Sequence, residues 1–178
     1  MRRKAFGFLA FAAGLAILVI ALKVLNGLPL IAQKDLMRRY GDFDEMRTTL
    51  GIGQVFVPSY FPEDFRWPPT GILAQGKPYP AVIMEFERSG EGKAREVGMM
   101  ICQAAGDDFA PGGPLTIVRI RERATYPLKG RSAVLEVGSG PDGAPCSRIS
   151  WREKDVRITV LARLTPFEVM KVAESMLR

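Results

Sequence analysis

The sequence predicts an α+β protein with an N-terminal transmembrane helix, then an antiparallel β-sheet, closed by a C-terminal helix. Three observations support this prediction. A long uncharged apolar stretch begins at residue 5, short segments in the middle of the chain alternate apolar and polar residues, and a helix-capping sequence lies near the end. The 178 residues leave room for one domain beyond the membrane segment.

The apolar stretch carries no charge between residues 5 and 22 and extends to residue 25 if Lys23 reaches the membrane interface. About twenty helical residues span a bilayer core. A cleaved signal peptide is the alternative, but its apolar stretch is normally shorter, and Leu30-Ile31-Ala32 lacks a small residue at the first cleavage position. We therefore expect residues 5–25 to form a single-pass signal anchor.

Arg2, Arg3 and Lys4 form a basic tail, residues 1–4, which the positive-inside rule places in the cytoplasm. The rest of the chain is then expected beyond the bacterial inner membrane, in the periplasm or outside the cell. Four of the 25 basic residues lie in or before the anchor, which leaves 21 basic against 19 acidic residues. This near balance argues against nucleic acid as a partner.

A juxtamembrane helical stalk is expected at residues 26–50, with Pro29 near its start and Asp42 as the N-cap of a second part. Its apolar residues recur every three or four positions: Leu36, Tyr40, Phe43, Met46 and Leu50. The extracytoplasmic α+β domain is expected at residues 51–178.

Alternation and turn residues predict strands at 71–75, 81–88, 95–103, 115–123, 132–137, 146–153 and 156–163. Short links between them favour antiparallel hairpins. A capping box then begins at Thr165, with Pro166 at the first helical position and Glu168 as its acidic member. The helix that follows has one apolar face, which is expected to pack on the sheet: Val169, Val172, Ala173 and Met176.

Three stretches, QVFVPSYFPEDF at 54–65, SRISWREKDVRITVLA at 147–162 and TPFEVMKVAESML at 165–177, resemble the uncharacterised extracytoplasmic domain of bacterial anti-sigma factors and cell-envelope proteins. The resemblance covers about residues 45–177. The first motif is matched at Val57, Pro58, Tyr60 and Pro62, with Phe61 in place of leucine and Asp64 in place of glycine.

The resemblance implies a curved sheet similar to that of lipoprotein carriers, and an envelope-facing sensing or binding module. It transfers no catalytic residue. Because only a four-residue tail precedes the anchor, it implies no anti-sigma activity.

Cys102 and Cys146 are the only cysteines, and alternation places both on one face of the sheet. In an oxidising compartment this pair favours a disulfide, with two unpaired thiols as the alternative.

The chain has no histidine, which excludes a histidine base for a serine or cysteine nucleophile and removes the commonest metal ligand. The acidic clusters at 107–108 and 42–45 fit a turn and the first turn of a helix better than a calcium site. We therefore expect no catalytic residues, no metal and no cofactor.

Two groups of residues are candidates for a binding surface. The aromatic group could rim a hydrophobic groove, or it could be core beneath a proline-rich loop; its members are Tyr60, Phe61, Phe65 and Trp67. The basic group alternates along one predicted strand and could meet lipid headgroups or an acidic partner, or it could protect a sheet edge; its members are Arg119, Arg121 and Arg123.

These features together predict a non-catalytic, membrane-anchored module that binds, senses or scaffolds another cell-envelope protein. The alternative is a lipid or lipoprotein carrier. A carrier requires an apolar cavity in the curved sheet, and the residues expected to line it are Val97, Met99, Ile101, Val134 and Ile158.

Overall fold

The structure, a computed structural model, describes residues 18, 37–88, 96–106, 109 and 112–177. The chain divides into two compact units, Met1–Leu36 and Met37–Arg178, and all the strands and helices named below lie in the second. Within the described ranges, no helix is both long and apolar enough to cross a membrane. The predicted anchor at residues 5–25 lies outside those ranges, apart from Leu18.

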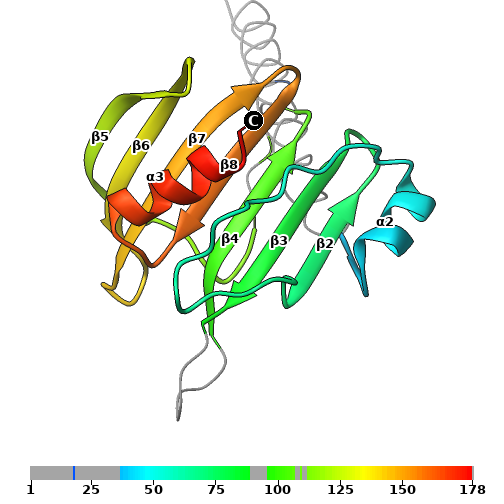
Figure 1. Ribbon diagram of the computed structural model, residues 1–178, viewed down its shortest axis with the longest axis horizontal. Helices are drawn as coiled ribbons and strands as arrows, with labels where there is room; N and C mark the ends of the chain where they lie inside the picture. Colours follow the sequence, from blue (N-terminus) through cyan, green and yellow to red (C-terminus); the bar gives the residue numbers. More distant parts are fainter. Residues whose placement is uncertain (1–17, 19–36, 89–95, 107–108, 110–111, 178) are drawn as a thin grey trace, which may run out of the picture. The chain divides into compact units, whose positions relative to one another are not determined.

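The second unit is built on one curved, open sheet of eight antiparallel strands (Figure 1). Its strand order is β1-β2-β3-β4-β8-β7-β6-β5, so the last strand of the chain pairs with β4 at the centre. The strands are β1 (Arg38–Tyr40), β2 (Gly71–Gln75), β3 (Ala81–Glu87), β4 (Val97–Ala104), β5 (Arg119–Leu128), β6 (Arg131–Ser139), β7 (Pro145–Glu153) and β8 (Val156–Ala162). The α+β class and the curved sheet closed by a C-terminal helix are thus confirmed.

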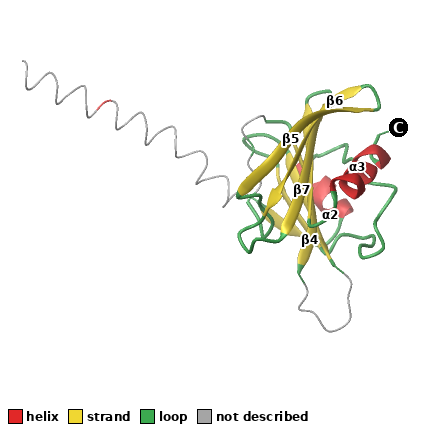
Figure 2. Cartoon of the chain, turned by 90° about the vertical axis from the view of Figure 1, so that its left-hand side faces the viewer, coloured by secondary structure: helices red, strands yellow, loops and turns green. Residues whose placement is uncertain are grey.

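Two helices, α2 (Phe43–Leu50) and α3 (Pro166–Ser175), lie on the same side of this sheet (Figure 2). The N-cap at Thr165 is confirmed, because its side chain accepts a hydrogen bond from the backbone N–H of Glu168 at 3.3 Å. The Glu168 carboxylate accepts from Tyr60 and Lys171. Val169 and Val172 are completely buried where α3 packs on β7 and β8. Burial of this apolar face, rather than the intrinsic preference of a ten-residue segment, holds α3 in place.

Central strand β4 is buried on both faces. Met99 and Ile101 face the helices and belong to the main core, which the segment 51–70 also covers. Met100 points the other way, into a smaller cluster that Phe109 and Leu115 cover. The strand therefore reads as a nearly continuous apolar run, as expected for a strand covered on both sides.

The prediction of a helical stalk at 26–50 is wrong at Arg38–Tyr40, because these residues form β1 and pair with β2. α2 and its N-cap Asp42 are confirmed, since the Asp42 carboxylate accepts from the backbone N–H of Glu45. Tyr40 and Met46 both fill the main core, so this part of the chain belongs to the compact unit, which begins at Met37 rather than at residue 51.

The predicted disulfide is not formed, because Cys102 and Cys146 are buried free thiols. Both face the smaller cluster, as alternation predicts. However, β8 lies between their strands; Cys102 pairs with Thr159, whereas Cys146 lies just beyond the Ser147–Ala162 pair. They are thus separated by two strand spacings and by several residues along the sheet, which exceeds the Cα separation of about 7 Å that a disulfide can bridge.

Candidate binding site: an arginine groove opposite the helices

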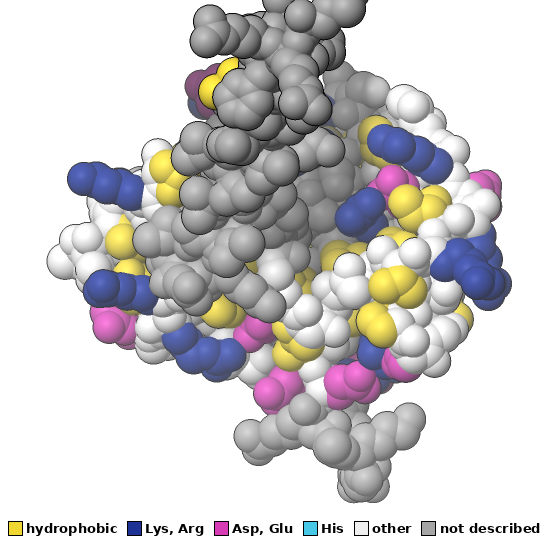
Figure 3. All heavy atoms as spheres, turned by 180° about the vertical axis from the view of Figure 1, so that it is seen from behind, with side chains coloured by type: hydrophobic (Ala, Val, Ile, Leu, Met, Phe, Trp, Pro, Cys, Tyr) yellow, Lys and Arg dark blue, Asp and Glu magenta, His cyan; other side chains and the backbone are white. Residues whose placement is uncertain are grey.

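A groove of about 500 Å³ lies across β5–β8 on the face of the sheet opposite α3. Among the described residues that line it, four are arginines and one, Glu136, is a carboxylate. We call it the arginine groove; the residues that define it are Arg123, Arg148, Arg152, Arg157, Glu136, Ser150, Thr159, Phe109 and Leu115. Basic side chains are visible on both sides of this face in Figure 3.

The strand register places Arg123, Glu136 and Arg148 in one row across β5, β6 and β7. The Glu136 side chain is only 7% exposed and lies between the two arginines. Arg148 donates from Nε to Glu136 Oε2 at 2.6 Å, and Nε of Arg123 is 3.6 Å from Oε1. Both arginines therefore hold the carboxylate, but the Arg123 side chain remains 67% exposed at the rim.

Further along β7 and β8, on the same face, the groove is lined first by two hydroxyl residues and then by a second pair of arginines. Ser150 and Thr159 face each other across β7 and β8, with their hydroxyl oxygens 3.0 Å apart. One position further along the same face, Arg152 lies directly opposite Arg157. This pair places two further guanidinium groups among the residues that line the groove.

Alternation along β7 explains why its arginines face this groove. Ile149 and Trp151 point toward α3 and are buried in the main core, so the residues between and beside them point the opposite way. Trp151 is therefore a core residue. Arg148 and Arg152 were not among the predicted site residues, because only the pairing of β7 with β6 and β8 brings them beside other charges.

The aromatic group, a candidate for a binding surface or for core, is divided between the two, although Phe61 and Trp67 are in contact with ring centroids 6.3 Å apart. Phe65 is buried in the main core, and Phe61 is partly buried against it. Trp67 is 46% exposed and stacks on Phe43, with ring centroids 5.4 Å apart. Tyr60 is at the surface and donates its hydroxyl to Glu168 at 2.7 Å, which raises its pKa.

The basic stripe predicted at Arg119, Arg121 and Arg123 is broken by a β-bulge. The pairing with β6 shifts between Ile120 and Glu122, which leaves Arg121 without an opposite residue. Arg123 consequently shares a face with Glu136, whereas Arg119 pairs with Ser139 on the other face. At the bulge the chains approach so closely that a Cβ on Gly138 would collide with the carbonyl oxygen of Arg119.

Guanidinium groups bind carboxylates and phosphates through paired hydrogen bonds, so the groove suits an anionic ligand. The hydroxyls of Ser150 and Thr159 bond to each other, and Thr116 supplies a further hydroxyl to the lining. Within the described ranges, no group of three acidic or cysteine residues could hold a metal ion.

Comparison with known proteins found no matching family model, no matching curated protein and no matching solved structure.

Proposed function

We propose that this chain is a non-catalytic binding module of the bacterial cell envelope that holds an acidic region of another envelope protein in its arginine groove. The observation that carries the proposal is the convergence of four arginines from three strands, β5, β7 and β8, on one groove. Residues 5–25 would anchor the module in the inner membrane, and the basic tail would keep the N-terminus in the cytoplasm. The resemblance to extracytoplasmic envelope domains supports the same location.

The charges of the groove support a protein partner with exposed carboxylates. Glu136 neutralises part of the positive charge, chiefly that of Arg148. Arg123 stays mostly exposed beside that pair, and Arg152 and Arg157 lie on the same face. Electrostatic complementarity of this kind increases the association rate and selects the partner, and the interaction weakens as salt is added.

A lipid or lipoprotein carrier is less well supported. The five residues expected to line its cavity do not share a face: Met99, Ile101 and Ile158 are completely buried in the core under the helices. Val134 faces the arginine groove instead, and Val97 packs beside the smaller cluster. A lipid chain requires continuous apolar walls, whereas the apolar residues of this groove are interspersed with guanidinium and hydroxyl groups.

The proposal is tested by purifying the full-length chain from membranes in mild detergent and identifying bound proteins by mass spectrometry. The wild type is compared with Arg123→Gln/Arg157→Gln, which neutralises two groove arginines while leaving the Arg148–Glu136 pair in place. Arg66→Gln is the matched control, because Arg66 is exposed on the 51–70 segment, which covers the opposite face. Circular dichroism checks that all three proteins are folded.

We expect a stoichiometric envelope protein with the wild type and with Arg66→Gln, and a loss of about tenfold or more with the groove variant. Equal recovery with all three proteins would show that the partner binds elsewhere. Recovery of lipid without any protein partner would favour the carrier.

A further inference from the structure

Strand β5 ends the sheet with an open edge. It pairs with β6 only, so among the described strands nothing pairs with its other side. Apart from Tyr126 and Leu128, all its residues are exposed. An open edge of this kind can accept an added strand from another chain.

The turn after β5 shows which backbone groups point outward. Lys129 and Gly130 form a two-residue turn with positive φ at both positions, as type I′ hairpins require. Leu128 and Arg131 flank this turn and therefore form a hydrogen-bonded pair. Hydrogen-bonded and non-hydrogen-bonded pairs alternate along an antiparallel ladder, so every second residue before Leu128 points its backbone polar groups away from β6 and toward the open edge. These residues are Pro127, Thr125 and Arg123. Pro127 fits this alternation, because a proline in a sheet must place its nitrogen where no ladder hydrogen bond is needed.

Two features limit the length of the open edge. Pro127 offers no N–H at one end, and the bulge at Arg121 interrupts the strand at the other. Between them, residues 122–126 form a regular stretch of about 17 Å, enough for an added strand of about five residues. Thr125 and Arg123 supply its outward N–H and C=O groups.

The charge of the edge favours an acidic strand over a second copy of this chain. Over its whole length β5 carries three arginines against one glutamate, and within residues 122–126 the charged residues are Arg123 and Glu122. Two full β5 strands side by side would therefore bring equal positive charges together. An acidic strand would be attracted instead. Because Arg123 faces the groove, the side chains of an added strand on that face would lie beside the groove arginines.

We propose that the acidic region of the partner binds as an added β-strand along residues 122–126 and directs alternate carboxylates into the arginine groove. This inference rests on the proposed function and names its mode of binding. Main-chain hydrogen bonds to the edge provide affinity, and the arginines select carboxylate side chains.

The test uses the full-length chain in mild detergent and a fluorescent seven-residue peptide in which glutamate alternates with valine. Binding is measured by fluorescence anisotropy at low salt. Two further peptides carry backbone N-methyl groups, one on the inner glutamates and one on the valines. In an added strand, the N–H groups of either the glutamates or the valines point toward β5, and those of the other residue type point toward solvent. We therefore expect one of the two methylated peptides to bind about tenfold or more weakly, and the other to bind like the unmodified peptide.

A protein variant tests the same edge from the other side. Thr125→Pro removes an outward N–H without removing a β5–β6 hydrogen bond, whereas Thr125→Ala removes the side chain and keeps the N–H. The difference in peptide affinity between the two variants measures the contribution of the Thr125 N–H to binding. We expect Thr125→Pro to bind the peptide at least about fivefold more weakly than Thr125→Ala. Thermal melting checks that both variants fold, and the N-methylated peptides test the wild type independently.

The outcomes separate the two proposals. If the unmodified peptide binds, and Arg123→Gln weakens it, but neither N-methylation nor Thr125→Pro has an effect, strand addition is overturned and groove binding stands. If the unmodified peptide fails to bind, both proposals fail for acidic segments. If sedimentation shows that Thr125→Pro turns a dimer into a monomer while the peptide has no effect, the edge binds a second copy and the inference is overturned.

Discussion

Glu136 and Arg123 belong to one salt-bridge cluster but differ in role: Glu136 is buried and paired within the sheet, whereas Arg123 is mostly exposed and accessible to a ligand. The Glu136 carboxylate is buried and has to be paired, because an unpaired buried charge costs several kcal/mol. Arg148 is committed to that pair. Arg123 makes only a long contact and stays mostly exposed, so it can turn toward a bound carboxylate at little cost.

The two thiols give a prediction at the residue scale. Burial raises the pKa of Cys102 to about 12 and also raises the pKa of Cys146. Because the thiolate is the reactive form, both should resist a maleimide reagent at neutral pH while the chain is folded. In denaturant without a reducing agent, both should be alkylated, as mass spectrometry can measure. Alkylation that requires prior reduction would show a disulfide and contradict the geometry.

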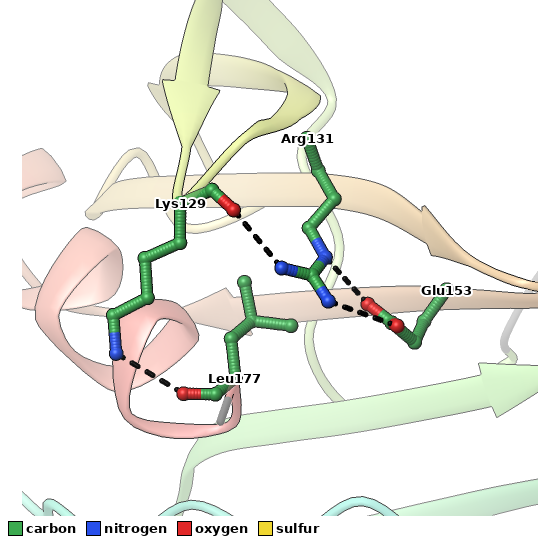
Figure 4. A network of polar contacts seen from close by, with 4 residues as sticks. All are labelled: Lys129, Arg131, Glu153 and Leu177. Atoms are coloured by element: carbon green, nitrogen blue, oxygen red, sulfur yellow. Dashed lines mark hydrogen bonds and ion pairs between the residues drawn. The ribbon is translucent and has the colours of Figure 1, made fainter.

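At the scale of elements, one polar network joins the ends of two hairpins to the end of α3 (Figure 4). Arg131 donates to the two Glu153 oxygens at 2.7 and 3.0 Å and also to the Lys129 carbonyl. Lys129 in turn donates its ammonium to the Leu177 carbonyl at 3.0 Å. The turns of the β5–β6 and β7–β8 hairpins are thereby fixed to the C-terminal segment.

This network predicts a pH dependence of stability. The hydrogen bonds from Arg131 lower the pKa of Glu153 below its ordinary 4.5. A lowered carboxyl pKa means that the stabilisation is complete above pH 4.5 and is lost as the pH falls through the lowered pKa. We expect Glu153→Gln to reduce the free energy of unfolding by about 1 kcal/mol at pH 7.

Urea unfolding measured from pH 7 downward checks this expectation, and the variant and the wild type should converge as the pH falls. Glu122→Gln is the control, because Glu122 is exposed on β5 and pairs with an apolar residue, Val137. A difference between Glu153→Gln and the wild type that persists unchanged at low pH would show that the side chain acts by packing rather than by charge.

The whole chain consists of two compact units, and the prediction at this scale concerns their separation. All the described strands belong to Met37–Arg178, so residues 37–178 should fold without the N-terminal unit. We expect the full-length chain to stay with membranes after alkaline carbonate extraction, and residues 37–178 to move to the supernatant and melt cooperatively. A shortened chain that is folded and still remains with the membrane would place the attachment in the second unit.

Much of the fold was accessible from the sequence because it is encoded locally. The strand predicted at 71–75 is β2 with the same bounds, and Thr165 is the N-cap of α3. The predicted strand at 115–123 instead lies at Arg119–Leu128. A proline normally ends a strand, and Pro127 is tolerated only because it lies on an edge, which a single sequence does not reveal.

The sequence by itself determined the α+β class, the terminal helix and the face of each thiol, since alternation and capping depend on neighbours along the chain. Only the tertiary structure decided that Arg38–Tyr40 is a strand, that the thiols lie apart and that a bulge divides the arginines of β5. The arginine groove likewise exists only in the tertiary structure, because strand order and register bring Arg123, Glu136 and Arg148 together from distant positions in the sequence. Pairing between strands is a long-range property, and a pattern within one strand does not specify its neighbours.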